Sequence, residues 1–308
     1  MSPASDRLQV VVDEASGLDG FSPIRGISEM QSGDASRTQL NAAEMIWNRL
    51  RSYFSGDVPR GMLLCAQIPL ILICYFGTIT FTALALRGSY DWRSSAISYL
   101  LSPGHDPAYH WIASLGLALS GFLGIPFGGY IRDRLRPVSR LGANIGMAVL
   151  VTGFVTLILA ATIVTRRMHH VIGKFGMHEI LARTSALALG AGIVCFCWCV
   201  LRELYNRRTN RGPHIVRLAF TWSMLIFPPL SAALTCGICA FIPRSSVPWL
   251  LPLCQLLRQS PLWKLAFWEW IGSIAVFLFL LSAAAFLPKQ EQFLGNTSTP
   301  VQERGSFE

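Results

Sequence analysis

Six long runs of apolar residues constrain the fold of this chain more than any other feature. They cover about residues 62–86, 109–131, 141–164, 180–201, 218–242 and 263–287. As a helix, each run is long enough to cross roughly 30 Å of hydrocarbon. Only 14% of the residues are charged, whereas a soluble domain of this size carries about 25%. We therefore expect an all-α, polytopic bundle of six transmembrane helices.

The polar ends of the chain frame this membrane domain, which we place at residues 62–288. Residues 1–39 are rich in Ser, Gly, Asp and Glu and show no sustained hydrophobic periodicity. Such a composition predicts a disordered tail. Residues 289–308 are also polar, and we expect a second disordered tail there.

Residues 40–57 carry a different pattern. Ile46, Leu50 and Phe54 recur every fourth residue, with Arg49 and Arg51 on the opposite side. This spacing favours a short amphipathic helix that lies on the membrane surface. An ordinary linker before the first span is the alternative.

The fifth run contains the pair Pro228-Pro229. Proline has no backbone N–H and disrupts a helix in its interior. We therefore expect the fifth span to be broken and kinked at this pair.

The basic residues predict how the chain is oriented. Arginines crowd the loop between the second and third runs and the loop between the fourth and fifth. Because Lys and Arg are enriched in cytoplasmic loops, both termini are predicted to be cytoplasmic, in the endoplasmic reticulum or another endomembrane. The same arginines account for the net charge of +9, so we expect no nucleic-acid partner.

Three closely spaced cysteines resemble a metal cluster. Successive helical residues are about 100° apart, so Cys197 points away from Cys195 and Cys199. They are expected to pack as small apolar residues. His169 and His170 could ligate a metal only if further ligands converged on them, and we predict no metal site.

One carboxylate lies inside the last run. Glu269 is flanked by Trp268 and Trp270, with Trp263 close by. A charged side chain within a span costs roughly 2.5–3.5 kcal/mol on insertion scales. Either a Ser, Thr or Arg183 donates a hydrogen bond to Glu269 and the pair fixes helix register, or Glu269 stays protonated and acts as a general acid.

Other ionisable residues collect in the non-cytoplasmic half. Asp91 and His178 are the candidates for a catalytic partner or terminal base, and His110 is a candidate for substrate contact. Glu179 and Arg183 are four residues apart on one helix, a spacing that predicts a structural ion pair.

A proton donor in an aromatic, water-poor site suits one reaction class. It protonates an epoxide or alkene of a lipid-soluble isoprenoid, and indole faces stabilise the resulting cation by ~0.5–2 kcal/mol each. Trp263, Trp268 and Trp270 would bind the substrate. This reaction needs no cofactor.

Two resemblances are carried by these residues. The Ile97-Ser-Tyr-Leu100 stretch, the Gly-rich second run, the His-containing loop before the fourth run and Glu269-Trp270 resemble the DRAM/Sfk group of six-span membrane proteins over about residues 62–288. The resemblance to that group implies a role in autophagy, lipid asymmetry or lipid-anchor processing.

The overall layout is also similar to fungal integral-membrane terpene cyclases of meroterpenoid pathways, especially the ascofuranone type. That likeness implies isomerase or lyase chemistry in secondary metabolism, on a farnesylated phenol that is often epoxidised first, with acidic residues as proton donors.

Three functional hypotheses follow. The first is a membrane-embedded cyclase of a prenylated aromatic, with membrane lipids and other pathway enzymes as partners. The second is a non-enzymatic six-span protein that binds lipid or scaffolds a partner. The third is a proton-coupled small transporter.

Overall fold

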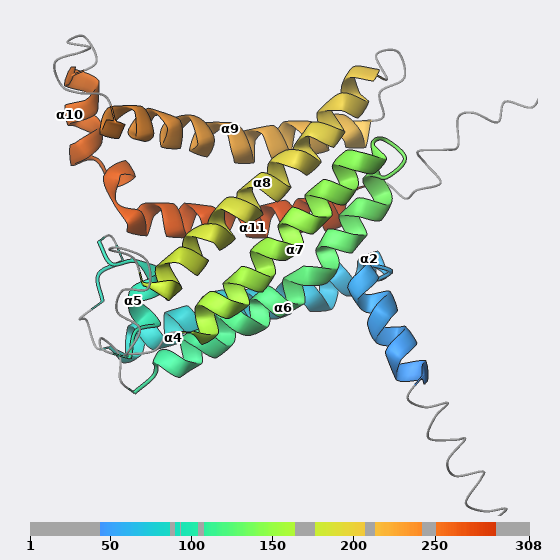
Figure 1. Cartoon of the computed structure of the whole chain (residues 1–308), viewed down its shortest axis with the longest axis horizontal. Coiled ribbons are helices and arrows are strands. Elements are labelled where there is room, and N and C mark those ends of the chain that lie inside the picture. The colour runs from blue at the N-terminus through green and yellow to red at the C-terminus, as the bar shows by residue number, and fades with distance from the viewer. Residues whose placement is uncertain are drawn as a thin grey trace, which may run out of the picture. The chain divides into compact units, whose positions relative to one another are not determined.

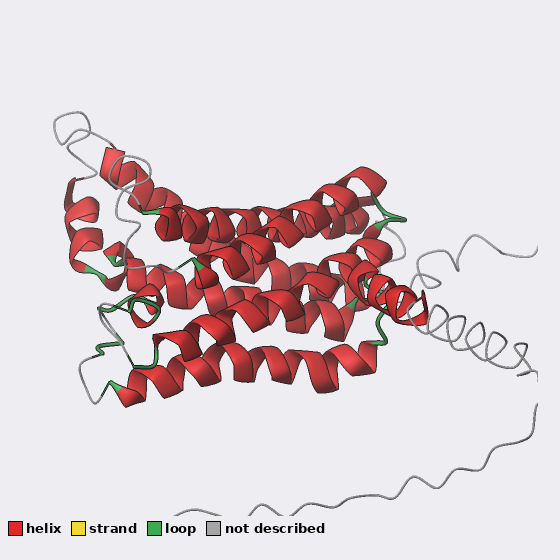
Figure 2. Ribbon diagram, turned by 60° about the horizontal axis from the view of Figure 1, so that its bottom comes forward, coloured by secondary structure: helices red, strands yellow, loops and turns green. Residues whose placement is uncertain are grey.

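The computed structural model describes residues 44–86, 90–92, 94–103, 108–163, 176–206, 213–241 and 251–287. Within these ranges the chain is helical with connecting loops, and no strand is present (Figure 2). Six of the described helices are long and apolar enough to cross a membrane. The protein is therefore an all-α, six-span bundle, as predicted, and a multi-pass membrane protein.

The spans follow the six apolar runs closely (Figure 1). The first, Arg60–Ala85, is continuous through α2 (Arg60–Met62), η1 (Leu63–Gln67), α3 (Ile68–Leu72), η2 (Ile73–Gly77) and α4 (Thr78–Ala85). The others are α6 (His110–Leu135), α7 (Arg140–Thr162), α8 (Met177–Asn206), α9 (Pro213–Phe241) and α11 (Leu265–Phe286). Short helices α5 (Ile97–Leu100) and α10 (Leu251–Gln259), with the 3₁₀ turn η4 (Pro261–Trp263), lie in the connections.

The chain divides into two units, Met1–Arg49 and Leu50–Glu308. The predicted tails 1–39 and 289–308 lie outside the described residues. Residues 44–55, within the segment 40–57, form a helix. It ends at Gly56, whose φ of 88° favours glycine. A Cβ at Gly56 would lie 2.0 Å from the Tyr130 backbone nitrogen, so only glycine fits this contact with α6.

The first span contains two π-helical turns, η1 and η2. Pro69 is the second residue after η1 and has no N–H for the carbonyl four residues before it. Such π turns are rare in helices and frequently occur at functional sites. Here η2 carries Tyr75 and Phe76, which both reach α11.

Glycines allow α7 and α8 to approach closely. Leu150 of α7 packs on Gly192 of α8, and Leu189 of α8 packs on Gly153 of α7. The Ser185 hydroxyl also donates to the Gly153 carbonyl at 2.8 Å. Small residues at an interface strengthen van der Waals packing between spans, since lipid is as apolar as the helix faces.

Glycines also allow close approach along the second span. A Cβ at Gly124 of α6 would lie 2.4 Å from the Phe154 ring of α7, and one at Gly116 would lie 2.0 Å from the Thr78 hydroxyl of α4. Through these contacts α6 lies between the first span and α7.

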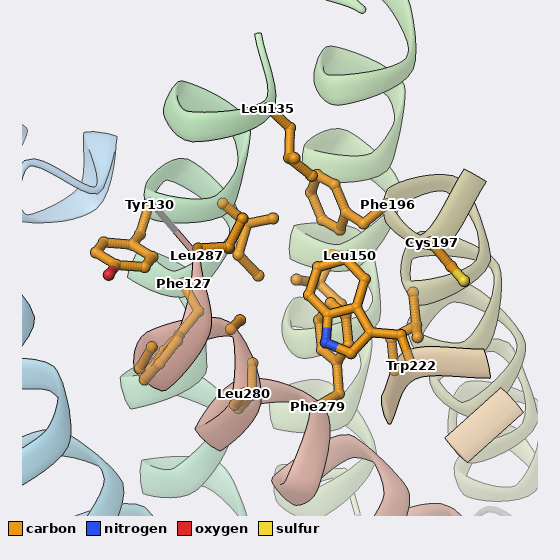
Figure 3. Packing of buried hydrophobic residues seen from close by; sticks show 14 of the residues in the cluster. Phe127, Tyr130, Leu135, Leu150, Phe196, Cys197, Trp222, Phe279, Leu280 and Leu287 are labelled. Atoms are coloured by element: carbon orange, nitrogen blue, oxygen red, sulfur yellow. The ribbon is translucent and has the colours of Figure 1, made fainter. Parts of the chain in front are cut away.

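Aromatic side chains join α8, α9 and α11 in the core (Figure 3). The Trp222 and Phe279 rings lie 4.6 Å apart, and Phe196 stacks on the other side of Phe279 at 6.4 Å. Trp222 is fully buried, and its indole N–H donates to the Ser282 hydroxyl at 2.8 Å. A buried indole N–H needs such a partner.

The prediction of a broken fifth span is wrong, because α9 runs from Pro213 to Phe241 as one helix. Pro228 and Pro229 each remove one backbone hydrogen bond, and the bonds before and after them keep the helix continuous. The Ser231 hydroxyl donates to the Pro228 carbonyl at 2.9 Å. Transmembrane helices tolerate proline when hydroxyl groups and neighbouring helices compensate in this way.

Candidate functional site

Glu269 lies in the second turn of α11, and its carboxyl contacts the loop between the first and second spans. The Ser98 backbone N–H donates to Oε2 at 3.2 Å, and the Ser98 hydroxyl donates to Oε1 at 3.1 Å. Ser98 is in the first turn of α5, where backbone N–H groups have no partner within the helix. Glu269 therefore caps α5 and ties this loop to the last span.

A second polar contact lies one turn further along α11. The Tyr75 and Ser273 hydroxyls are 2.5 Å apart, and Ser273 donates to the Glu269 carbonyl at 2.7 Å. Tyr75 belongs to the π turn η2. The first span, the loop helix α5 and α11 thus meet at Glu269.

Aromatic rings cover one side of this junction. The Trp270 indole lies 5.3 Å from Trp92 and stacks on Phe76 at 6.4 Å. Tyr90 contacts Trp92 edge-on at 5.1 Å. The rings come from the first span, the loop and α11, so the loop contributes as much of this wall as the helices do.

Tyr90 stabilises the conformation of the loop next to these rings. It is buried, and its hydroxyl donates to the Ser95 and Ala96 carbonyls at 3.0 and 3.3 Å. Burial, and after it the negative charge of Glu269, raises the pKa of Tyr90 from 10.0 to about 12. The phenol is neutral at physiological pH and acts as a donor.

His178 is the second residue of α8 and lies near the same junction. Its Nδ1 lies 2.7 Å from the Ala160 carbonyl of α7, so Nδ1 carries the proton and Nε2 is free to accept one. Nε2 is buried and has no hydrogen-bond partner among the residues that the structure describes. The ring is near enough to Glu269 for the two groups to interact electrostatically.

Asp91, the other predicted candidate for a catalytic partner, lies in the loop between the first and second spans. Its side chain is exposed and accepts a hydrogen bond from the Ser94 hydroxyl, while its carbonyl accepts from the Ser95 N–H at 2.8 Å. These bonds form a turn within the loop. These contacts of Asp91 therefore stabilise the loop.

Two of the predicted substrate-binding tryptophans interact with the connection before α11: Trp263 is part of the turn η4, and Trp268 lies in the first turn of α11. The Trp268 indole N–H donates to the Leu262 carbonyl at 2.8 Å. Trp263 is 38% exposed, and the Arg258 guanidinium lies 5.5 Å from its ring centroid. Of the three tryptophans, Trp270 is the one that contacts the rings around Glu269.

The remaining predicted residues lie in the first two turns of α6 and α8. Arg183 and Glu179 form the predicted ion pair at 2.5 Å, but both side chains are exposed. Exposed pairs contribute about 0–1 kcal/mol, so this one is a surface feature. His110 is the partly buried first residue of α6.

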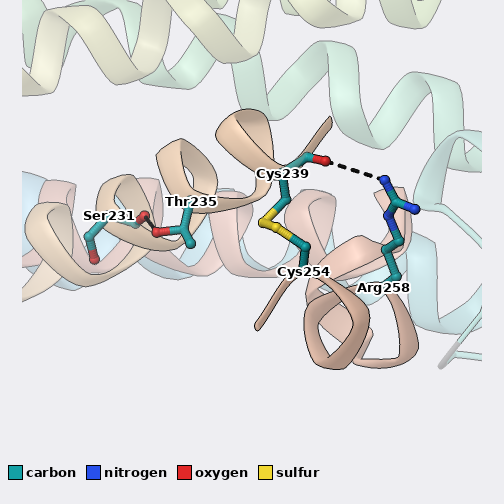
Figure 4. Close-up of a disulfide and its surroundings, with 5 residues drawn as sticks. All are labelled: Ser231, Thr235, Cys239, Cys254 and Arg258. Atoms are coloured by element: carbon teal, nitrogen blue, oxygen red, sulfur yellow. Dashed lines mark hydrogen bonds between the residues drawn. A yellow bond between two sulfur atoms is a disulfide. The ribbon is translucent and has the colours of Figure 1, made fainter. Parts of the chain in front are cut away.

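A disulfide joins Cys239 of α9 to Cys254 of α10 (Figure 4). Reasoning from sequence missed this disulfide, because the two cysteines are 15 residues apart and no motif links them. In the described part of the chain, no three His, Cys, Asp or Glu side chains converge to hold a metal ion. His169 and His170 lie outside that part.

Sequence reasoning also missed Ser98, Tyr75, Tyr90 and Trp92. Each is an ordinary loop or span residue by composition, and only the fold brings it to Glu269. The sequence predicts a serine among the possible partners of that carboxyl, but it does not indicate which serine.

Comparison of the chain with known protein families, curated proteins and solved structures finds no match.

Proposed function

We propose that the protein is a membrane-embedded terpene cyclase acting on a prenylated aromatic. The observation that carries this proposal is the carboxyl of Glu269, which lies against Ser98 and beside the rings of Trp270 and Trp92. An acid beside aromatic faces inside a lipid-embedded protein has what cation-forming cyclisation needs, a proton and a sheltered environment.

The reaction balances without a cofactor. Glu269 transfers its proton to an epoxide oxygen or to an alkene carbon of the substrate. With an epoxide, one C–O bond breaks and its oxygen becomes a hydroxyl. With an alkene, the π electrons form the new C–H bond. Either way, a tertiary carbocation forms. A neighbouring alkene attacks that cation, which closes a carbon–carbon bond and moves the charge along the chain.

The final cation must lose a proton, and His178 is the group we assign to this step. Its Nε2 is buried, unpartnered and oriented to accept. The side chain of Asp91, the other candidate, is exposed and bonded to Ser94. Proton loss to His178 makes the overall reaction an isomerisation.

Trp270, Trp92 and Phe76 supply the π faces for the intermediate cations. Each indole face stabilises a nearby cation by about 0.5–2 kcal/mol. The substrate, a farnesylated phenol or its epoxide, partitions into the bilayer and reaches the site from lipid.

We also propose that both termini are cytoplasmic. The Cys239–Cys254 disulfide lies between the fifth and sixth spans. Disulfides persist in oxidising compartments and are rare in the cytosol. This supports a luminal or extracellular side for α10, which agrees with the arginine-rich loops on the other side.

Expression in a heterologous host tests the proposal. Cells fed a farnesylated phenol or its terminal epoxide are extracted, and the products are separated by mass spectrometry. Wild type should convert one of these substrates into a cyclised isomer of the same mass, and Glu269→Gln should not. If no isomer forms from either substrate, or if the variant forms as much as wild type, the proposal fails.

A non-enzymatic lipid-binding or scaffolding role is the second candidate. Both oxygens of Glu269 accept hydrogen bonds from Ser98, which is also what a purely structural tie requires. Such a protein would tolerate Glu269→Gln with its function intact. A transporter has less support, because Asn144 and Thr152, its candidates for a continuing polar path, are both exposed on α7.

A further inference from the structure

The short helix α10 lies between the ends of two spans, and one of its faces is exposed in the part of the chain that the structure describes. Leu253 is 43% exposed and Leu256 is 66% exposed. At about 100° per residue these leucines lie about 60° apart, whereas Gln255 lies about 160° from Leu253. The helix therefore has an apolar face and an opposite polar face.

Three attachments fix α10 and the turn that follows it. The Cys239–Cys254 disulfide joins α10 to the end of α9, and the Arg258 guanidinium donates to the Cys239 carbonyl at 3.3 Å (Figure 4). The Trp268 indole on α11 donates to the Leu262 carbonyl of the turn η4. The helix is thus held at the level where α9 ends and α11 begins.

We propose that α10 is a membrane-surface helix whose Leu253–Leu256 face inserts into lipid at the boundary between headgroups and acyl chains. Its nine residues extend only about 14 Å, so α10 cannot cross a membrane. Both flanking helices are spans, which places α10 at the membrane boundary.

The residues beside α10 fit the same position. Arg258 lies over the Trp263 ring at 5.5 Å, and tryptophan and basic side chains are typical of the membrane–water interface. An amphipathic helix there buries its apolar face among lipid chains and keeps its polar face in the headgroups. Lipid is therefore the occupant of the exposed leucine face, and this inference does not depend on the proposed cyclase activity.

Site-specific photocrosslinking tests this placement. The photoreactive residue p-benzoylphenylalanine replaces Leu253, Leu256 or Gln255 in full-length protein reconstituted into phosphatidylcholine vesicles. After irradiation, peptides from α10 are analysed by mass spectrometry for phosphatidylcholine adducts. The two leucine positions should give adducts in several-fold higher yield than Gln255.

The Cys239–Cys254 disulfide, detected on nonreduced peptides, verifies that α10 is attached in each variant. Equal adduct yields at all three positions would overturn the proposal. Crosslinks from the leucine positions to protein instead of lipid would also overturn it, and would identify a second copy or another protein as the occupant.

Discussion

At the scale of single residues, Glu269 connects parts of the chain that are far apart in sequence. Ser98 donates to both of its carboxyl oxygens from a loop 171 residues earlier. A carboxyl held by two donors has a fixed orientation, which both a structural tie and a catalytic acid require.

Ser98→Ala removes one of the two bonds to Glu269 and leaves the backbone N–H. We expect the apparent free energy of unfolding to fall by about 1–3 kcal/mol, the typical cost of leaving a buried hydrogen-bonding group without its partner. Thermal unfolding in detergent measures the change. Ser94→Ala, which removes an exposed hydroxyl from the same loop, is the matched control, and equal effects of the two substitutions would argue against the Ser98–Glu269 contact.

Tyr90 makes stability depend on pH in the alkaline range. Below pH 10 its hydroxyl is neutral in folded and unfolded protein alike. Between pH 10 and about 12 it ionises only in the unfolded protein, because burial and then the Glu269 charge raise its folded pKa. Rising pH therefore favours unfolding.

Wild type should lose stability more steeply than Tyr90→Phe as pH rises from 10 to 12. The difference is at most about 3 kcal/mol, since one pKa unit corresponds to about 1.4 kcal/mol. Unfolding midpoints of both proteins across this pH range measure it. Parallel pH profiles would show that Tyr90 is not buried as described.

At the scale of helices, close packing of α7 on α8 depends on glycine. A Cβ at Gly192 would lie 2.9 Å from the backbone nitrogen and the Cβ of Leu150, whereas a Cβ at Gly190 meets nothing within 4 Å. Both glycines are on α8. They therefore separate the effect of packing from the effect of helix propensity.

Gly192→Ala should destabilise the protein by about 1–3 kcal/mol, the usual cost of overpacking. Gly190→Ala should be neutral or slightly stabilising, because alanine is the better helix former. The unfolding midpoints of the two variants give the comparison. If Gly192→Ala unfolds at the wild-type temperature, the close approach of α7 and α8 is wrong.

Hydropathy predicted the helices well because the bilayer itself requires long apolar helices. The ends of the runs agree with the spans to within a few residues, apart from α8, which continues to Asn206. The π turns of the first span, the unbroken α9 and the small helix α5 were not predictable from sequence. The helix α5, for example, depends on the contact of Ser98 with Glu269, which a pattern of apolar residues does not encode.

At the scale of the whole molecule, sequence and structure support one orientation by different routes. The arginines of the short loops predict the cytoplasmic side, and the Cys239–Cys254 disulfide favours the opposite side for α10. The carboxyl of Glu269 could be singled out from sequence, because a charge in a span is unusual. Its neighbours could not, since they come from three separate segments.

The sequence Asn296-Thr-Ser tests this orientation. It matches the pattern for N-glycosylation, but a cytoplasmic carboxyl terminus never meets the glycosylation machinery. We expect protein expressed in a eukaryotic host to carry no glycan at Asn296, so treatment with an N-glycosidase should leave its mass unchanged. A glycan at this residue would reverse the proposed topology.

The most direct test of the central claim is the initial rate of ring closure by the protein reconstituted into vesicles with a farnesylated phenol epoxide. Glu269→Gln should lower this rate at least ~100-fold, the lower range for general acid catalysis. Glu179→Gln, which removes an exposed carboxyl at the same end of the bundle, should leave the rate unchanged. A Glu269→Gln protein that closes the ring at the wild-type rate would contradict the account.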